Sequence, residues 1–236
     1  MVAESPETAT QDRLYQSLAR TLVAELATGR HPVGSRLPAE RDLALLHAVS
    51  RPTVREAIIA LEVMGLVDVR VGSGAYVKRL PHADDVPGFG VTAFELTEAR
   101  LLIEGEAAAM AAELITDEEV TRLDELVDAI AQENRQPSGK EAADREFHLS
   151  IARATRNAAI VDMIDRLWRQ RATSPQSALL HDKARTANIK PVVEEHRAVV
   201  DALRQRDGAA ARAAMRAHLS AVLDSLLFAT DDGGQG

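Results

Sequence analysis

SRLPAERDLALLHAVSRPTVREAIIALEVMGLVDVRVGSGAYV, residues 35–77, decides the fold of the first third of the chain. Leu37-Pro38 predicts the start of a short helix, because proline is tolerated where its missing N–H has no helical partner. His47-Ala48-Val49 predicts a tight turn. Ser50 is a good N-cap for a second helix, which Gly65 ends. The stretch therefore begins as two short helices joined by a turn.

Apolar spacing supports these helices and predicts a hairpin after them. Val67, Val69 and Val71 alternate with polar residues, as in a half-buried strand, and the glycines of 72–74 turn the chain back through residues 75–77. Helical spacing predicts the inward-facing residues, which are Leu43, Leu45 and Leu46 on the first helix and Val54, Ile58, Leu61 and Met64 on the second.

Helix, turn, helix and hairpin is the order of a winged helix-turn-helix, which lays the start of its second helix in the DNA major groove. Arg51, Thr53 and Arg55 are left to point outward from that end. Arginine pairs bidentately with guanine, threonine contacts bases, and Ser50 can hold a phosphate. The alternative is that these arginines only solvate a helix face, but their clustering at one end favours DNA binding.

The motifs of this stretch resemble the GntR superfamily of bacterial transcription regulators. They are Pro-x-Glu-Arg at 38–41, Val-Ser-Arg-x-x-Val-Arg-Glu-Ala at 49–57 and Leu-x-x-x-Gly-Leu at 61–66. The resemblance implies contacts with double-stranded DNA from Arg41, Arg51, Thr53 and Arg55. It also places the turn near Gly72 and Gly74 at the minor groove.

Composition and charge are compatible with such a protein. The net charge of the 236 residues is −8, but residues 30–79 carry eight Lys and Arg against five Asp and Glu, and so +3. A mildly basic head on an acidic body suits DNA, because only the local patch meets phosphates. The sequence has no Cys, no apolar run near the ~20 residues of a membrane span and no signal-peptide pattern. We therefore expect a cytoplasmic location and no membrane partner.

The pattern divides the chain into a winged helix-turn-helix domain over residues 10–79, a Pro- and Gly-containing linker over 80–91 and an all-helical domain over 92–230. His82 in the linker is expected to be exposed and without function. The fold class is mainly α, with a helical bundle as the second domain. The predicted helices are 12–27 in the first domain and 94–114, 116–133, 140–154, 158–171, 191–205 and 209–229 in the second. Residues 173–189 are expected to be irregular or to hold a short helix near 176–180. Apolar residues on several sides of the helix at 107–112 would permit packing into a homodimer.

One cluster in the helical domain is typical of a metal site. Asp144 and His148 are four residues apart and share a helix face, and His196 and His218 each lie in the middle of another helix. A carboxylate with three imidazoles suits Zn²⁺, Ni²⁺, Co²⁺ or Mn²⁺ better than Ca²⁺. Spacing alone leaves open that each histidine is an ordinary core or surface residue.

This part of the chain resembles the FCD effector domain of the FadR-like branch of that superfamily. The resemblance rests on residues 98–104, Asp144-x-x-Phe147-His148, Glu195-His196 and His218. It implies a metal held by Asp144, His148, His196 and His218, and an organic-acid effector on that metal that Arg100 helps to bind. The alternative for Arg100 is an ion pair with Glu104 one turn along the helix. Residues 174–189 are longer than the family suggests, and the segment with His181 is either a lid on the pocket or a surface loop.

These observations predict a dimeric, ligand-responsive repressor that binds a palindromic operator and answers to a small carboxylate. Residues 57–62 and 70–74 are similar to hexuronate- and sugar-acid-responsive members, which favours a sugar acid. The first rival is a metal-dependent helical-bundle enzyme. It lacks paired Glu-x-x-His motifs, since Arg145, Val193 and Met215 stand three residues before the histidines. The second rival is a sensor for which the metal itself is the signal.

Overall fold

The computed structural model describes residues 13–82, 85, 90–135, 141–186 and 192–228. They fall into two compact units, of which the second begins at Gly90. Half of the linker predicted over 80–91, residues 136–140 and both chain ends lie outside the described residues. His82, which is described, is exposed. The two units are described separately.

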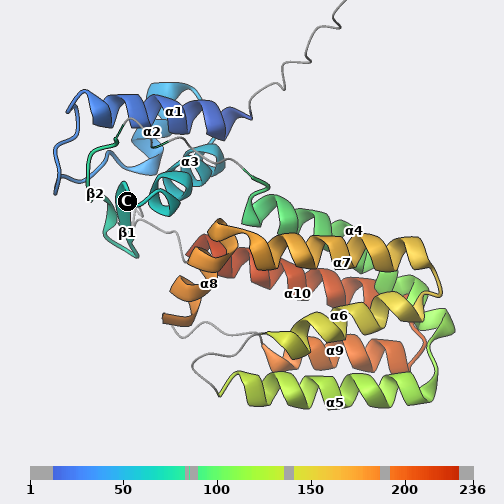
Figure 1. The fold of residues 1–236 in the computed structure, drawn as a ribbon. Helices are drawn as coiled ribbons and strands as arrows, with labels where there is room; N and C mark the ends of the chain where they lie inside the picture. Colours follow the sequence, from blue (N-terminus) through green and yellow to red (C-terminus); the bar gives the residue numbers. More distant parts are fainter. Residues whose placement is uncertain (1–12, 83–84, 86–89, 136–140, 187–191, 229–236) are drawn as a thin grey trace, which may run out of the picture. The chain divides into compact units, whose positions relative to one another are not determined.

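The first unit has the elements predicted for a winged helix-turn-helix (Figure 1). The Ser50 side chain caps α3 by accepting a hydrogen bond from the Thr53 N–H. The two strands pair antiparallel, with Val67 opposite Val77. Val54, Ile58 and Leu61 are buried with Leu43 in one core, as predicted. The elements are α1 (Leu14–Ala27), α2 (Glu40–His47), α3 (Arg51–Val63), β1 (Val67–Arg70) and β2 (Gly74–Val77).

Helix α2 departs from the prediction in its apolar face. Leu45 and Leu46 are 76% and 58% exposed, whereas Glu40 and Leu43 are buried. The buried face is therefore centred between positions 40 and 43, which puts Leu46 beyond its edge and Leu45 on the opposite side. The helix begins at Glu40 rather than at Pro38, and it ends at Ala48, whose φ of 53° is left-handed.

The second unit is all helical in its described residues. Thr92 and Thr116 cap α4 and α5 through capping boxes with Glu95 and Glu119. Figure 1 shows α4 and α10 side by side within the bundle, and both contact α9. The helices are α4 (Ala93–Leu114), α5 (Asp117–Glu133), α6 (Ala142–Ala154), α7 (Ala158–Thr173), α8 (Pro175–Thr186), α9 (Val193–Arg204) and α10 (Gly208–Phe228).

Two expectations for this unit can be compared with its helices. Near residues 107–112, Ala107, Ala108, Ala111 and Ala112 are buried inside the chain itself, because α4 is central and neighbouring helices cover more than one of its sides; packing into a homodimer stays a prediction. Of the two alternatives for residues 173–189, the helix near 176–180 is confirmed, and it is longer than predicted, because it forms α8. The Ser174 hydroxyl accepts a hydrogen bond from the Ser177 N–H, and Pro175 takes the first helical position.

Within the described residues, the search for a helix both long and apolar enough to cross a membrane found none.

Candidate functional site

The start of α3 carries two arginines that share one buried carboxylate. Arg55 pairs bidentately with Glu40 at the start of α2, with Nε 2.8 Å and Nη2 2.6 Å from its two oxygens. Arg51 lies further from the same carboxylate, with Nη2 3.9 Å from Oε2, and half of its side chain is exposed. The outward direction predicted for Arg55 is therefore wrong, because its guanidinium faces α2. Arg51 keeps the outward position.

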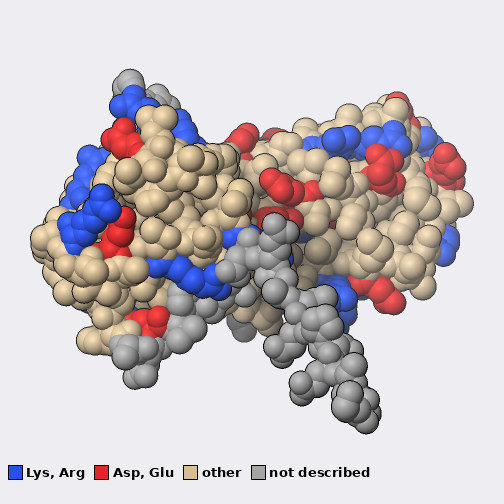
Figure 2. Space-filling view, turned by 90° about the horizontal axis from the view of Figure 1, so that it is seen from above, with Lys and Arg blue, Asp and Glu red and all other residues tan. Residues whose placement is uncertain are grey.

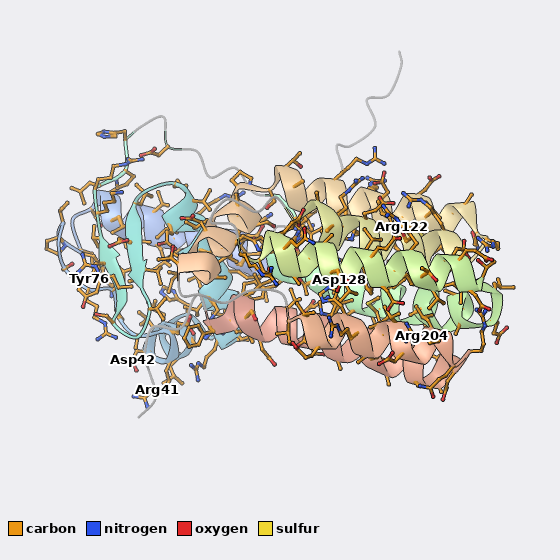
Figure 3. The ribbon with its side chains drawn as sticks, turned by 90° about the horizontal axis from the view of Figure 1, so that it is seen from below. Arg41, Asp42, Tyr76, Arg122, Asp128 and Arg204 are labelled. Atoms are coloured by element: carbon orange, nitrogen blue, oxygen red, sulfur yellow. The ribbon has the colours of Figure 1, made fainter. Side chains whose placement is uncertain are left out.

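Three other residues predicted to contact DNA, Arg41, Ser50 and Thr53, are exposed or partly exposed. Ser50 and Thr53 are bonded to each other through their hydroxyls at 2.8 Å as part of the helix cap. Figure 3 shows Arg41 on α2 projecting away from the ribbon beside Asp42, and its side chain is mostly exposed. The structure thus presents Arg41 and Arg51 as exposed cations from neighbouring helices.

Two glycines shape the turn between β1 and β2, the hairpin that forms the wing. Gly74 has a φ of +106°, and a Cβ there would lie 2.4 Å from Nε of Arg36. Gly72 also has a positive φ, of 72°, and the Ser73 N–H donates to the Arg70 carbonyl across the turn. The positive φ of both residues, and the Arg36 side chain beside Gly74, favour glycine at the turn. Contacts of Gly72 and Gly74 with DNA stay a prediction.

Figure 2 shows one face of the molecule by charge. Blue Lys and Arg side chains spread over the first unit, whereas in the second unit they stand among red Asp and Glu side chains. Ion pairs are also present on the opposite face of the second unit, which Figure 3 shows from below with Arg204 and Asp128 labelled. Arg204 pairs there with Asp124, and Arg197 pairs with Asp128.

The four residues predicted as metal ligands come together inside the second unit. Each offers a ligand atom, these atoms lie within 4.8 Å of one another, and all four residues are buried. Asp144 and His148 come from α6, His196 from α9 and His218 from α10. His196 Nε2 is 2.9 Å from Asp144 Oδ1, and His148 Nε2 is 3.5 Å from the same oxygen. The packing of three helices thus brings one carboxylate and three imidazoles together.

An outer layer of acceptors orients each imidazole. Nδ1 of His148 contacts a Glu104 oxygen, Nδ1 of His196 is 2.9 Å from the Val192 carbonyl, and Nδ1 of His218 is 3.0 Å from Glu195. Donation of the Nδ1 proton to such an acceptor leaves the Nε2 lone pair for a metal. Neither Glu104 nor Glu195 was given this role from the sequence, although both stand within the motifs at 98–104 and 195–196.

His196 provides a test of whether a cation fits this site. Its two nitrogens both face acceptors, the Val192 carbonyl and the Asp144 carboxylate, each at 2.9 Å. A neutral imidazole has one N–H and satisfies only one of them. A metal ion held by His196 and Asp144 would satisfy the other without protonating the ring. The donor set and its hydrogen bonds therefore fit a divalent transition metal.

The electrostatics of the cluster agree with this fit. Burial opposes ionisation of Glu104, but Arg100 and His148 lower its pKa to about 2. Burial likewise opposes ionisation of Asp144, yet hydrogen bonds from His148 and His196 hold its pKa well below the ordinary value. Burial lowers the pKa of His218 to about 4, so that this ring is neutral at pH 7. Burial opposes protonation of His148, but Glu104 and Asp144 raise its pKa, so that without a metal its imidazolium and Arg100 face the two buried carboxylates. A bound metal would take the place of the positive charge on His148.

Arg100 lies beside this cluster on α4 and is itself buried. Its Nε is 2.7 Å from Glu104 Oε1, and its guanidinium stacks over Trp168 with Cζ 4.1 Å from the ring centroid. Its Nη2 has no hydrogen-bond partner among the described residues. The ion pair with Glu104, the predicted alternative, is thus present, and it still leaves one nitrogen of the fork available.

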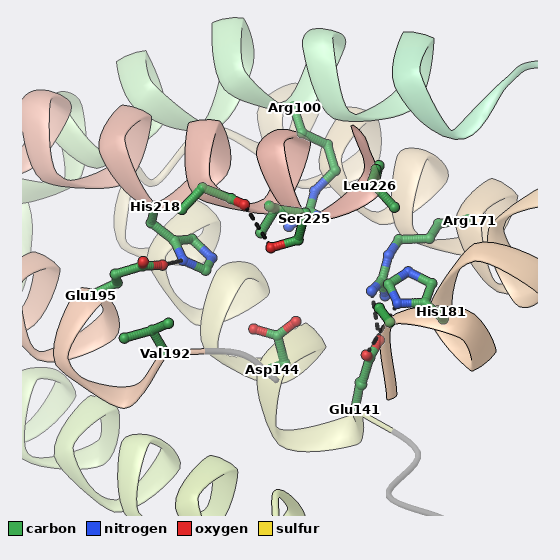
Figure 4. Close-up of a pocket in the computed structure, with 13 residues that line it drawn as sticks. Arg100, Glu141, Asp144, Arg171, His181, Val192, Glu195, His218, Ser225 and Leu226 are labelled. Atoms are coloured by element: carbon green, nitrogen blue, oxygen red, sulfur yellow. Dashed lines mark hydrogen bonds and ion pairs between the residues drawn. The ribbon is translucent and has the colours of Figure 1, made fainter. Parts of the chain in front are cut away.

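Arg100 also lines a pocket beside the cluster (Figure 4). The pocket has a volume of about 70 Å³, room for several waters or a small organic molecule. Asp144 and His218 line it, which gives the cluster access to a ligand. Sequence reasoning missed several residues of its wall, because they are distant along the chain and belong to no motif: Glu141, Arg171, Val192, Ser225 and Leu226. His181, left without a role, also lines the pocket.

Comparison with known proteins gives consistent results. Residues 95–221 match the FCD domain, and residues 14–77 match the bacterial regulatory proteins of the gntR family. The chain is 36% identical to the Exu regulon transcriptional regulator of Escherichia coli strain K12, over 93% of this chain and 87% of that protein. It is 32% identical to the Uxu operon regulator of Haemophilus influenzae, over 93% and 84%. A solved structure, Streptococcus agalactiae GntR, shares 29% identity with a TM-score of 0.45, covering 89% of this chain and 99% of that one.

The two matched regions coincide with the two kinds of structure described above, a winged helix-turn-helix and an all-helical bundle. The proteins with these domains are transcription regulators, and the enzyme considered as a rival is not supported. The chain belongs to the GntR family of transcription regulators and carries an FCD domain behind its DNA-binding domain.

Proposed function

We propose that this regulator is a repressor that binds a palindromic operator as a homodimer and is switched by a small organic acid. The observation that carries the proposal is the buried Arg100 Nη2, which has no hydrogen-bond partner among the described residues and lies beside the four candidate metal ligands. A buried cationic donor without an acceptor is costly, so the position favours an incoming anion. A carboxylate supplies the two oxygens that the arginine fork and a metal ion accept.

Asp144, His148, His196 and His218 would hold the metal, which is Zn²⁺, Ni²⁺, Co²⁺ or Mn²⁺ by the chemistry of its ligands. Bound there, the ion would supply positive charge and a coordination position for an effector oxygen. Asp144 and His218 line the pocket, so an effector inside it reaches the same cluster.

The names of similar proteins bear on the class of acid. The relatives in Escherichia coli and Haemophilus influenzae are named for the Exu regulon and the Uxu operon. Together with the similarity to hexuronate-responsive members, this supports a sugar acid as the effector of this chain. A protein that senses only the metal needs no organic ligand, and Arg100 Nη2 would then stay without an acceptor. This favours an organic effector over a pure metal sensor.

In the first unit, the residues proposed to contact the operator are Arg41, Ser50, Arg51, Thr53, Gly72 and Gly74, and Arg55 is held behind them by Glu40. Arg41 and Arg51 are exposed cations that suit phosphates and base edges. The bidentate pair with Glu40 sets the position of Arg55 on α3. Two such heads on a two-fold dimer match a palindrome, and operator binding places the protein in the cytoplasm with the DNA. The effector switches the protein only if it binds the operator-competent and the incompetent states unequally.

A thermal-shift screen tests the proposal. The full chain is loaded with each of the four metals and heated with a panel of small carboxylic acids, including sugar acids. A ligand that binds only the native state raises the melting temperature. We expect a rise with at least one sugar acid that is lost when the metal is chelated. The absence of any rise with every acid and metal would contradict the proposal.

A further inference from the structure

The pocket has a second polar wall, formed by Glu141, Arg171 and His181, which we call the distal wall. Figure 4 shows these three side chains gathered on one side of the pocket, with His218, Glu195 and Val192 on the other. Arg171 Nη2 is 2.5 Å from Glu141 Oε2, and His181 Nδ1 is 3.4 Å from Glu141 Oε1. Glu141 and Arg171 are largely buried. The distal wall is formed by residues of α7 and α8 and by the residue before α6, whereas Arg100 lies on α4.

The distal wall carries no net charge although it is polar. Arg171 and Glu141 neutralise each other in their ion pair. Burial, helped by the charge of Arg171, lowers the pKa of His181 to about 4, so its imidazole is neutral at pH 7. The wall therefore offers carboxylate acceptors, guanidinium donors and an imidazole that serves as either, without attracting an ion.

A hydroxyl group matches this wall better than a second carboxylate does. A hydroxyl both donates and accepts, so it can donate to Glu141 and accept from Arg171. A carboxylate only accepts, and in a partly desolvated pocket it would be repelled by Glu141 while the best cation is already paired. The distal wall thus favours a hydroxyl end of a ligand over a carboxylate end, because only the carboxylate carries a charge.

The rest of the lining is apolar, apart from Glu195, which bonds His218, and Ser225. The Ser225 hydroxyl donates to the Ala221 carbonyl at 2.8 Å, which leaves its oxygen free to accept. The apolar lining residues of α8 and α10, and the residue before α9, provide contacts for C–H groups: Ala184, Val192, Ala221, Val222 and Leu226. A carbon chain that carries hydroxyls presents both surfaces that this arrangement requires.

We infer that the distal wall of Glu141, Arg171 and His181 selects polyhydroxylated acids with a single carboxylate and rejects acids with a carboxylate at both ends. The inference rests on the proposed function, because it assumes that the ligand carboxylate lies at Arg100 and the metal cluster. It assigns the specificity of the pocket to three residues other than Arg100 and the four candidate metal ligands.

Calorimetric titration of the metal-loaded full chain with three acids tests this. Gluconate has one carboxylate and a hydroxylated chain, glucarate has carboxylates at both ends of the same chain, and glycolate has a carboxylate without the hydroxylated chain. The variants are Glu141→Gln, His181→Leu and the control Glu146→Gln. Glu146 is on α6, five residues after Glu141, but it pairs with Arg153 at the surface and does not line the pocket.

We expect the unchanged protein to bind gluconate at least about tenfold more tightly than glucarate, because Glu141 repels the second carboxylate. In Glu141→Gln the ratio falls toward one and gluconate affinity drops about tenfold, since the charged acceptor is lost. His181→Leu weakens gluconate only. Glycolate binding stays constant in all variants and shows that the pocket is folded, and Glu146→Gln behaves like the unchanged protein.

An unchanged gluconate-to-glucarate ratio in Glu141→Gln, with glycolate still bound, would overturn the inference and leave the proposed function standing. Failure of the unchanged, metal-loaded protein to bind any of the three acids would instead contradict the proposed function, and the inference with it.

Discussion

Arg100 and His148 are joined through a single buried carboxylate, that of Glu104. Arg100 Nε lies 2.7 Å from one oxygen, and His148 Nδ1 contacts the other. The proposed effector clamp and a proposed metal ligand therefore depend on the same anion. A ligand that binds Arg100 also affects Glu104, which orients His148. We therefore expect the affinity for metal and the affinity for the effector to be coupled.

The first prediction concerns Glu104 itself. Glu104→Gln keeps the shape of the side chain but weakens the acceptor for His148 Nδ1, so metal affinity should fall roughly 10- to 100-fold, as is usual for such outer partners. Competition with a chromogenic chelator measures it. Glu106→Gln is the matched control, because Glu106 is exposed on the same helix and pairs with Arg212. Equal metal affinity in the two variants would show that Glu104 does not orient the ligand.

The second prediction separates the clamp from DNA binding. Arg100→Lys keeps the charge but loses the planar fork, so the acid concentration that releases the operator should rise at least about tenfold. Affinity for the operator without acid should stay unchanged. Dose-response curves by fluorescence anisotropy measure both, with Arg212→Lys on α10 as the control. If the Arg100→Lys curve overlays that of the unchanged protein, the clamp is excluded.

The third prediction addresses the metal directly. His196→Ala removes the imidazole that faces both Val192 and Asp144, so the metal content of the purified protein should fall strongly. Elemental analysis by mass spectrometry measures the metal-to-protein ratio. His82→Ala, at an exposed position, should keep the ratio of the unchanged protein. A full metal complement in His196→Ala would remove the site.

The fourth prediction tests the reading of bases. Arg51→Ala should weaken operator binding by about 1–3 kcal/mol and relax the preference at one base position, as expected for a lost bidentate contact. Binding to a set of single-base operator variants measures both effects. Arg122→Ala, on the surface of the second unit, is the control for loss of positive charge. Uniform weakening over all sequences would assign Arg51 to phosphates instead.

The fifth prediction concerns the buried acid of α2. Glu40→Gln leaves Arg55 with a weaker, uncharged partner, and unfolding of the first unit should require about 1–3 kcal/mol less free energy. Operator affinity should fall as well, because Glu40 positions Arg55 and lies near Arg51. Urea denaturation measures the first effect, with Asp42→Asn, an exposed acid on the same helix, as the control. Equal stability of the two variants would refute the role of Glu40.

Much of the fold could be predicted from local signals. The Ser50 cap and the alternating residues 67–70 are predicted directly from neighbouring residues, and the structure confirms them. The types of the four candidate metal ligands and their order along the chain could also be predicted, because the residues lie in recognisable motifs. Their convergence was not, since it depends on how α6, α9 and α10 pack.

The errors share one physical cause, which is that partners far along the chain decide the direction of a side chain. Glu40 is fifteen residues from Arg55 and draws it inward. The face of α2 is set by what it packs on, so Leu45 is exposed despite its apolar character. Arg171 and Glu141 form one wall of the pocket across thirty residues of sequence. No periodicity within a single helix carries this information.

The most direct test is the operator affinity of the full chain, by anisotropy on a DNA duplex selected from a random library, with and without a sugar acid. With metal bound, the acid should raise the dissociation constant about tenfold or more, the usual scale of a coupling between two sites. The shift should vanish after chelation and in His196→Ala. An unchanged dissociation constant in the metal-loaded protein, or a shift of the same size without metal, would contradict the account.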